Sequence, residues 1–229
     1  MRRSSVQSQL SLPVRHGWGG ARSGAGRKPG RRPLVLHRAR CEHKSRHPVH
    51  VTLRARREID SLRGARLYGV LESAIDGASR TNFRIAHFSV QRDHVHLIVE
   101  AHDKVALSSG LRGLSIRAAR AVNRAVGRSG AVWADRYRSR DLQTPREVRH
   151  ALCYVLHNSR KHGREVPPVD PCSSARWFDG WRDHDPTFDF AVDPPATVRP
   201  RTWLLTVGWR RHGLIRLGEA PASAPNRPA

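Results

Sequence analysis

Cysteine and long apolar runs are both scarce in this sequence. The three cysteines, Cys41, Cys153 and Cys172, are odd in number and widely spaced, which argues against a disulfide framework and favours a reducing cytosol. No apolar run reaches the length of a membrane span, and no continuous apolar stretch follows Arg2 and Arg3. We therefore expect neither a membrane protein nor a secreted one.

Acidic residues are also few, with 19 Asp and Glu against 42 Lys and Arg, for a formal net charge of +23. Residues 1–47 hold 12 basic residues and one acid, residues 48–163 hold 21 and ten, and residues 164–229 hold nine and eight. Because basic side chains displace counterions from nucleic acid, this excess predicts a polyanionic partner. The partner should meet the first two thirds of the chain.

The two ends of the chain differ from the middle in composition. Residues 1–47 are rich in Gly, Arg, Ser and Pro and are expected to form a disordered, DNA-contacting arm, because they cannot bury enough apolar surface to offset the ordering entropy. Residues 26–33 resemble an AT-hook for the minor groove, although a solvated basic tail or an Arg-rich organellar transit peptide fits the same composition. Residues 164–229 are rich in Pro, Asp and Trp and could pack on the core or form an appendage of unknown role, with a helical turn or two around 197–217.

The middle part, residues 48–163, has regular hydrophobic periodicity. Thr144 is a candidate N-cap, and the proline that follows it suits the first helical position. Glu147, three residues after Thr144, completes the pattern of a capping box, which predicts where the last helix starts. The order of elements is typical of an α+β, ferredoxin-like or RRM-like fold, with a four-stranded antiparallel sheet, helices on one face and a further C-terminal helix. The expected elements are strands over 49–54, 83–90, 94–99 and 131–142 and helices over 61–77, 107–126 and 144–162.

A His-x-His pair lies on the third predicted strand. Alternation places His94 and His96 on one face, while Val95 points to the other. Two neutral imidazoles so arranged can share one metal ion. A surface pair or an unrelated zinc site has the same pattern, so the pair alone does not decide the function.

The last predicted helix supplies two more candidates. Tyr154 and Asn158 are four residues apart and therefore lie one above the other, although a boundary tyrosine and a surface asparagine would look the same. Cleavage of a phosphodiester needs a nucleophile and a means of stabilising charge on the phosphate. Two histidines and the Asn158 oxygen could hold a divalent ion for the second task, and Tyr154 could attack to form a covalent phosphotyrosine. Such a linkage keeps the energy of the broken bond, so the strand can be rejoined.

Several of these elements recur together in a known family. The histidine pair after residues 88–93, with residues 154–158 at the end of the domain, resembles the single-tyrosine HUH transposases and most of all the REP-associated tyrosine transposases. The opening strand at residues 50–54 and the Trp-x-x-x-Tyr of residues 133–137 resemble the same branch. The resemblance covers about residues 48–163, but Ser159 replaces the proline of the family's Tyr-Ile-x-x-Asn-Pro element.

The resemblance implies a DNA transposase that cleaves and rejoins single-stranded DNA, often near a hairpin. It implies a 5′-phosphotyrosine, a free 3′-OH, and Mg²⁺ or Mn²⁺ as the cofactor. Carried over residue by residue, it makes His94, His96 and Asn158 the metal ligands and Tyr154 the nucleophile. It also implies a bacterial, nucleoid-associated location in the cytoplasm, and it leaves monomer and homodimer open.

Three arginines, Arg136, Arg138 and Arg140, alternate on the fourth predicted strand and could track a DNA backbone, as could Lys161, although a solvated basic face fits equally. Tyr137 is the rival nucleophile, for which we favour packing or base stacking.

Two further side chains near the predicted site are expected to be structural. His50 shares its alternation with Thr52 and could face the site, although a structural role is favoured, and Cys153 is expected to pack in the core. A non-catalytic nucleic-acid-binding module and a nuclease that uses water as nucleophile remain the competing functions.

Overall fold

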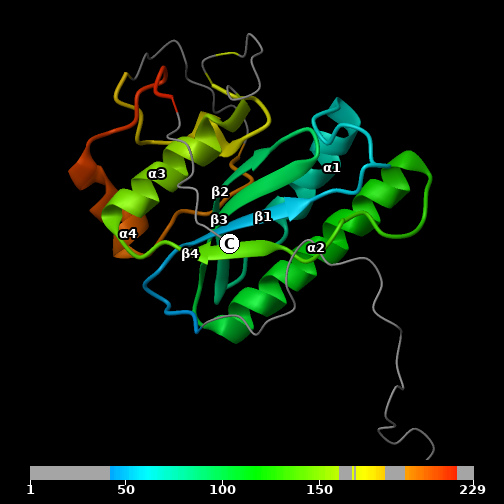
Figure 1. Ribbon diagram of the computed structural model, residues 1–229, viewed down its shortest axis with the longest axis horizontal. Helices are drawn as coiled ribbons and strands as arrows, with labels where there is room; N and C mark the ends of the chain where they lie inside the picture. Colours follow the sequence, from blue (N-terminus) through cyan, green and yellow to red (C-terminus); the bar gives the residue numbers. More distant parts are fainter. Residues whose placement is uncertain (1–41, 160–166, 168, 184–193, 221–229) are drawn as a thin grey trace, which may run out of the picture. The chain divides into compact units, whose positions relative to one another are not determined.

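The computed structural model describes residues 42–159, 167, 169–183 and 194–220 (Figure 1). At its centre is an antiparallel sheet with the strand order β2-β3-β1-β4. This architecture confirms the predicted α+β fold, and the first three strands lie within two residues of their expected bounds. The strands are β1 (Val49–Arg54), β2 (Phe83–Val90), β3 (His94–Ala101) and β4 (Arg138–Asp141).

The three main helices lie on the two faces of this sheet. α1 (Ala65–Asp76) and α2 (Lys104–Val126) pack on one face, and α3 (Pro145–Leu156) lies across the other (Figure 1). Alternate strand residues such as Val51 and Leu97 enter the core beneath α1 and α2. No helix in the described part of the chain is long and apolar enough to span a membrane.

The fourth strand is shorter than the expected 131–142. Ahead of Arg138 the chain makes only an isolated bridge, between Trp133 and Ala55, and the indole of Trp133 donates to the carbonyl of Ser115. Asp135 then accepts from the backbone N–H of the next residue, which holds a turn in place of a strand. The prediction of one long strand was wrong because alternation alone does not show where these local bonds replace ladder bonds.

The start of α3 follows the sequence signal closely. Thr144 accepts from the backbone N–H of Glu147, and the Glu147 carboxylate accepts from the backbone N–H of Thr144, so the capping box is complete. The helix ends at Leu156, six residues before the expected bound of 162, and Asn158 and Ser159 form a tighter 3-10 turn. Asn158 therefore follows Tyr154 by about one turn but lies beyond the α-helix itself.

The C-terminal part of the chain packs on the core, which is one of the two arrangements that the sequence left open. Trp209 and Ile215 are almost fully buried against α3 in a second hydrophobic cluster. Arg149 on α3 forms an ion pair with Glu219 through two hydrogen bonds, of 2.6 and 2.8 Å. It also donates to the Gly213 carbonyl. The short elements here are η2 (Ser174–Trp177), α4 (Trp203–Thr206) and η4 (Gly208–His212), the last two within the expected helical region.

The packed domain also begins before residue 48. The imidazole of His43 is buried, with Nδ1 3.0 Å from Asp141 Oδ2 and Nε2 3.1 Å from the Ala101 carbonyl. The expected boundary at 47/48 is therefore a few residues too late. The rest of the predicted arm, residues 1–41, lies outside the described residues.

The burial of Trp209 predicts a large effect on stability. Trp209→Ala should lower the free energy of unfolding by about 3–5 kcal/mol, because it empties the centre of the second cluster. Trp203→Ala is the matched control: that indole is 47% exposed, and its loss should cost less than about 1 kcal/mol. Urea denaturation measures both, and equal effects would contradict an integrated C-terminal part.

Stability should also depend on pH through a buried histidine. Burial lowers the pKa of His87 to about 4, with a smaller opposing effect from Asp179. Between this value and about 6.5 the unfolded chain binds a proton that the folded protein does not, so the free energy of unfolding falls as the pH falls. From pH 7 to pH 5 this residue should contribute a loss of about 2 kcal/mol.

Urea denaturation of His87→Gln at the two pH values tests this expectation. The substitution should remove the share of about 2 kcal/mol that His87 contributes, while His50, whose pKa is lowered equally, keeps its own share. Leu152→Ala, at a fully buried and non-titrating position, should lower stability equally at both pH values. A His87→Gln variant with the wild-type pH dependence would refute the assignment.

Candidate active site

The His-x-His pair lies on the sheet face that α3 crosses. On β3, Val95 and Leu97 enter the core beneath α1 and α2, so His94 and His96 project from the opposite face, as alternation predicts. Their ring centroids are 4.6 Å apart, and the two ring planes are nearly perpendicular. His96 is buried, whereas His94 keeps some exposure to solvent. The pair therefore opens towards solvent at one end.

α3 brings Tyr154 onto this pair. The Tyr154 ring lies 5.1 Å from the His96 ring in an edge-on arrangement, and its neighbours Val155 and Leu156 are buried in the second cluster. The sequence contains two other tyrosines. Tyr68 lies on α1, where its hydroxyl donates to Glu72, and Tyr137 is buried beneath α1 and α2. Of the three tyrosines, only Tyr154 lies on the same sheet face as the histidine pair, so the geometry favours it over Tyr137.

The neighbouring strand β1 supports His96. Thr52 is the register partner of His96, and its Oγ1 lies 3.1 Å from His96 Nδ1. His50 Nε2 lies 3.2 Å from the same nitrogen, and the His50 ring lies 5.7 Å from the Tyr154 ring. His50 thus faces the site, the alternative that the sequence left open beside the structural role it favoured. Sequence reasoning missed Thr52, although its place two residues after His50 was a usable signal.

Burial decides the protonation of His50. It lowers the pKa of His50 to about 4, with a further contribution from the positive charge of Arg140. The His50 ring is therefore neutral near pH 7, and its Nε2 can accept a hydrogen bond that His96 Nδ1–H donates. In that tautomer His96 Nε2 keeps a lone pair for a ligand.

His94 has a different support. Its Nδ1 lies 2.7 Å from Asp93 Oδ1, and Asp93 Oδ2 in turn accepts from Arg54 at 3.0 Å. Partial burial raises the pKa of Asp93, but the hydrogen bonds with His94 and Arg54 and the positive charge of Arg54 outweigh it and hold the pKa below its usual value. An ionised Asp93 favours the His94 tautomer whose Nε2 is the ligand atom. Sequence reasoning assigned Asp93 only to a turn.

The donor set fits a metal held by two histidines and one further oxygen. Both histidines use Nδ1 for a supporting contact, which is the usual arrangement of metal-binding imidazoles. No group of three His, Cys, Asp or Glu within the described ranges is arranged to hold a metal. Asn158 is 1% exposed, and its Nδ2 has no hydrogen-bond partner among the described residues.

Two of the predicted DNA-binding arginines share this face of the sheet. In the β1–β4 register Arg138 lies opposite Thr52, and Arg140 lies opposite His50, so both side chains project on the side of His96. Arg140 is also bonded to Glu147. Arg136 is half-buried and precedes β4.

Two further residues complete the comparison with the sequence predictions. Lys161 lies outside the described residues. Cys153 is buried in the core, as expected, and burial raises the pKa of its thiol to about 12.

Comparison with known proteins places this arrangement in a family. Residues 43–158 match the family described as "Transposase IS200 like", which is just over half of the chain. The chain belongs to the IS200-like transposase family. The matched segment contains His94, His96, Tyr154 and Asn158, and the resemblance inferred from the sequence is confirmed.

One solved structure shows how far the transposase fold extends. A REP-associated tyrosine transposase, solved bound to a REP hairpin, covers 73% of this chain and 99% of its own, with a TM-score of 0.53 and 22% sequence identity. The similarity therefore extends beyond the 43–158 segment and supports the same fold. A comparison with curated proteins returned no match.

Proposed function

We propose that this transposase cleaves and rejoins single-stranded DNA through a covalent bond to Tyr154. The observation that carries the proposal is the position of Tyr154, whose ring lies 5.1 Å from that of His96 on the sheet face that holds the histidine pair. A phenol beside two imidazoles that can hold a cation is an arrangement suited to nucleophilic attack on a phosphodiester.

In the proposed reaction Tyr154 Oη attacks the phosphorus of the scissile phosphate and gives its proton to solvent. The bond from phosphorus to the 3′ oxygen breaks, and that oxygen takes a proton from solvent to become a free 3′-OH. The phosphate stays on the tyrosine as a 5′-phosphotyrosine. Attack by a 3′-OH on this linkage reverses the step and joins the strands, so no outside energy source is needed.

His94 and His96, with Asn158 as the third ligand, would hold Mg²⁺ or Mn²⁺. When bound, the ion would stabilise negative charge on the phosphate and lower the barrier to attack. Asp93 and Thr52 hold the two rings in place through their Nδ1 atoms. Arg138 and Arg140 are proposed to contact the DNA strand on the same face.

The competing readings have less support. An RRM-like binding module presents its sheet face to RNA, whereas here α3 and the C-terminal part pack against that face. A nuclease that uses water needs no tyrosine beside the histidines. The REP hairpin in the similar solved structure supports a hairpin-forming DNA substrate. A cytoplasmic, nucleoid-associated location stays a prediction, and the oligomeric state stays open.

The covalent intermediate gives the first functional test. Incubation with labelled single-stranded hairpin DNA and Mn²⁺ should give an adduct that survives denaturing electrophoresis, and Tyr154→Phe should abolish it. Tyr137→Phe is the matched control and should keep the adduct, since that ring lies on the other side of the sheet. Cleavage without an adduct would indicate a water-using nuclease. DNA binding without cleavage under any divalent ion would indicate a binding module.

The support of His94 gives a second test. Asp93→Ala should weaken Mn²⁺ binding about 10–100-fold, because the ring loses the bond that orients it. Asp60→Ala is the matched control: its exposed carboxylate accepts from the backbone N–H of Ser61. The free Mn²⁺ signal in electron paramagnetic resonance measures both. Equal affinities in the two variants would count against His94 as a ligand.

A further inference from the structure

The described C-terminal part of the chain exposes one large aromatic ring. Trp203, the first residue of α4, is 47% exposed, whereas every other tryptophan, tyrosine and phenylalanine in the described ranges is buried or half-buried. Val207 follows it by four residues and is 49% exposed. The proposed strand-transfer chemistry uses neither side chain. Because water solvates a large apolar ring poorly, an exposed one is a candidate contact for a ligand.

The chain around Trp203 holds the ring in a fixed position. A Cβ on Gly208 would lie 2.7 Å from the indole, so the ring lies against the backbone where a side chain is missing. Just before α4, the Glu100 carboxylate accepts from the backbone N–H groups of Arg201, at 2.9 Å, and Thr202, at 2.7 Å. Glu100 is 4% exposed and lies on β3, the strand of the histidine pair. The ring is therefore preorganised, which lowers the entropy cost of binding a ligand.

The charge around Trp203 is positive. The guanidinium carbon of Arg211 lies 4.9 Å from the centre of the indole, within the range of a cation–π contact. Neither Arg201 nor Arg211 forms a salt bridge with a carboxylate of the described residues. The stretch 194–220 contains five arginines and a single carboxylate, Glu219, which is already paired with an arginine of α3. This local excess of positive charge suits an anionic ligand.

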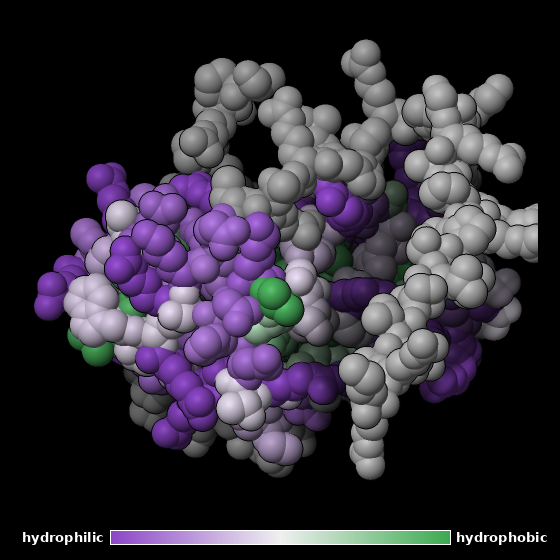
Figure 2. Space-filling view, turned by 90° about the horizontal axis from the view of Figure 1, so that it is seen from below, coloured by the Kyte–Doolittle hydropathy of each residue, from purple (hydrophilic) through white to green (hydrophobic). Residues whose placement is uncertain are grey.

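A ring beside unpaired arginines selects the class of ligand. Every nucleobase has a flat face that can stack on an indole, and guanidinium groups bind the phosphate oxygens of the same strand. An apolar protein surface would cover Trp203 and Val207 but would give the two guanidinium groups no partner. The surface at the α4 end of the molecule is mostly hydrophilic, with small pale and green areas among the purple side chains (Figure 2). These features favour unpaired nucleotides over an apolar protein partner.

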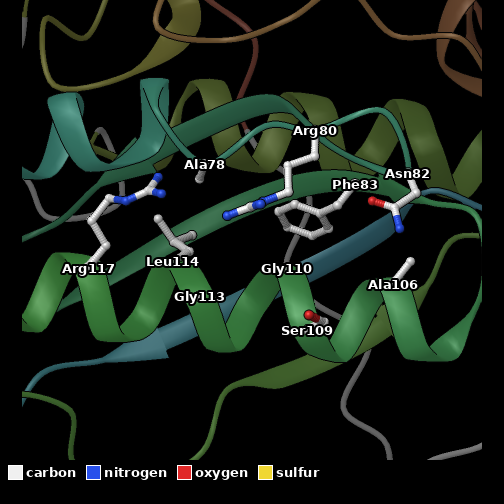
Figure 3. A pocket seen from close by; sticks show the side chains of 10 residues that line it. All are labelled: Ala78, Arg80, Asn82, Phe83, Ala106, Ser109, Gly110, Gly113, Leu114 and Arg117. Atoms are coloured by element: carbon white, nitrogen blue, oxygen red, sulfur yellow. The ribbon is translucent and has the colours of Figure 1, made fainter.

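A second basic feature of the described surface lacks a stacking ring. A cleft of about 390 Å³ lies between the start of β2 and the side of α2, and Arg80 and Arg117 reach into it (Figure 3). The one aromatic residue of its lining, Phe83, is 1% exposed. Phosphate contact alone is possible there, whereas the α4 region adds the means to bind a base.

We propose that Trp203, with Arg201 and Arg211, forms a stacking site for an unpaired nucleobase of the DNA strand. The two guanidinium groups bind phosphates next to the stacked nucleotide. The inference rests on the proposed function only in taking single-stranded DNA as the substrate. It adds a contact outside residues 43–158, the segment that matches the transposase family, and gives the C-terminal part a role in substrate binding.

Fluorescence anisotropy of the full chain with two labelled oligonucleotides tests the stacking. One is a strand of about ten thymidines, and the other has the same sugar-phosphate backbone with abasic sites in place of the bases. Trp203→Leu keeps an apolar side chain but removes the ring. It should lower the affinity for the thymidine strand about tenfold and leave the affinity for the abasic strand unchanged. Thymidine binding equal to that of the wild type would overturn the proposal.

Val207→Ala is the matched control for this variant. It removes apolar surface at an exposed position beside Trp203 without touching a ring, and it should bind both strands like the wild type. Urea denaturation should place Trp203→Leu close to the wild type, since the indole is about half exposed. A self-association of the DNA-free protein that both variants abolish, with DNA binding unchanged, would identify an apolar contact between copies and overturn the stacking site.

The arginines have a separate readout. Arg201→Gln/Arg211→Gln should weaken binding of both strands, and the salt dependence should become shallower by about two phosphate contacts. A salt dependence equal to that of the wild type would overturn the assignment of phosphate contacts to these two residues.

The Tyr154 adduct of the wild-type protein separates this inference from the proposed function. If the adduct forms and Trp203→Leu binds both strands like the wild type, this inference alone is wrong. If thymidine binding depends on Trp203 but no adduct forms under any divalent ion, the strand-transfer mechanism is wrong and the stacking site stands.

Discussion

The pairing of β1 with β3 is the constraint on which the rest of the structure depends. This ladder sets Thr52 opposite His96 and brings His50 to the same imidazole, while Val51 and Leu97 enter the core on the other side. Because side chains alternate with a period of two, a slip of one residue would turn the histidines into the apolar core and expose its valines and leucines. One register therefore determines both the hydrophobic core and the geometry of the site.

The position of Tyr154 depends on a second set of contacts, much of it beyond the segment that matches the transposase family. α3 is held on the sheet by its own apolar side and by the C-terminal part, through Trp209, Ile215 and the ion pair between Arg149 and Glu219. An amphipathic helix gains most of its stability from such packing. The described residues after 163 thus help to place Tyr154, the proposed nucleophile.

The two faces of the sheet differ in how they use charge. On the Tyr154 side, the histidines are held by hydrogen bonds, and desolvation keeps His50 neutral near pH 7. On the other side, α2 carries basic residues without a single acid, beside the cleft of Arg80 and Arg117. Charge that is desolvated and bonded serves precise placement, whereas charge in contact with water serves attraction to phosphate. The net charge of +23 does not by itself show this difference between the two faces.

The sequence by itself determined the features that depend on near neighbours. Alternation placed His94 and His96 on one face, and the capping box at Thr144 set the start of α3, because both follow from contacts within a few residues. The tertiary structure decided which elements meet. Thr52 and His50 reach His96 across 44 and 46 residues, Tyr137 is buried away from the site, and the C-terminal part closes a second core. Such contacts depend on strand register and on packing between distant segments, which no local pattern encodes.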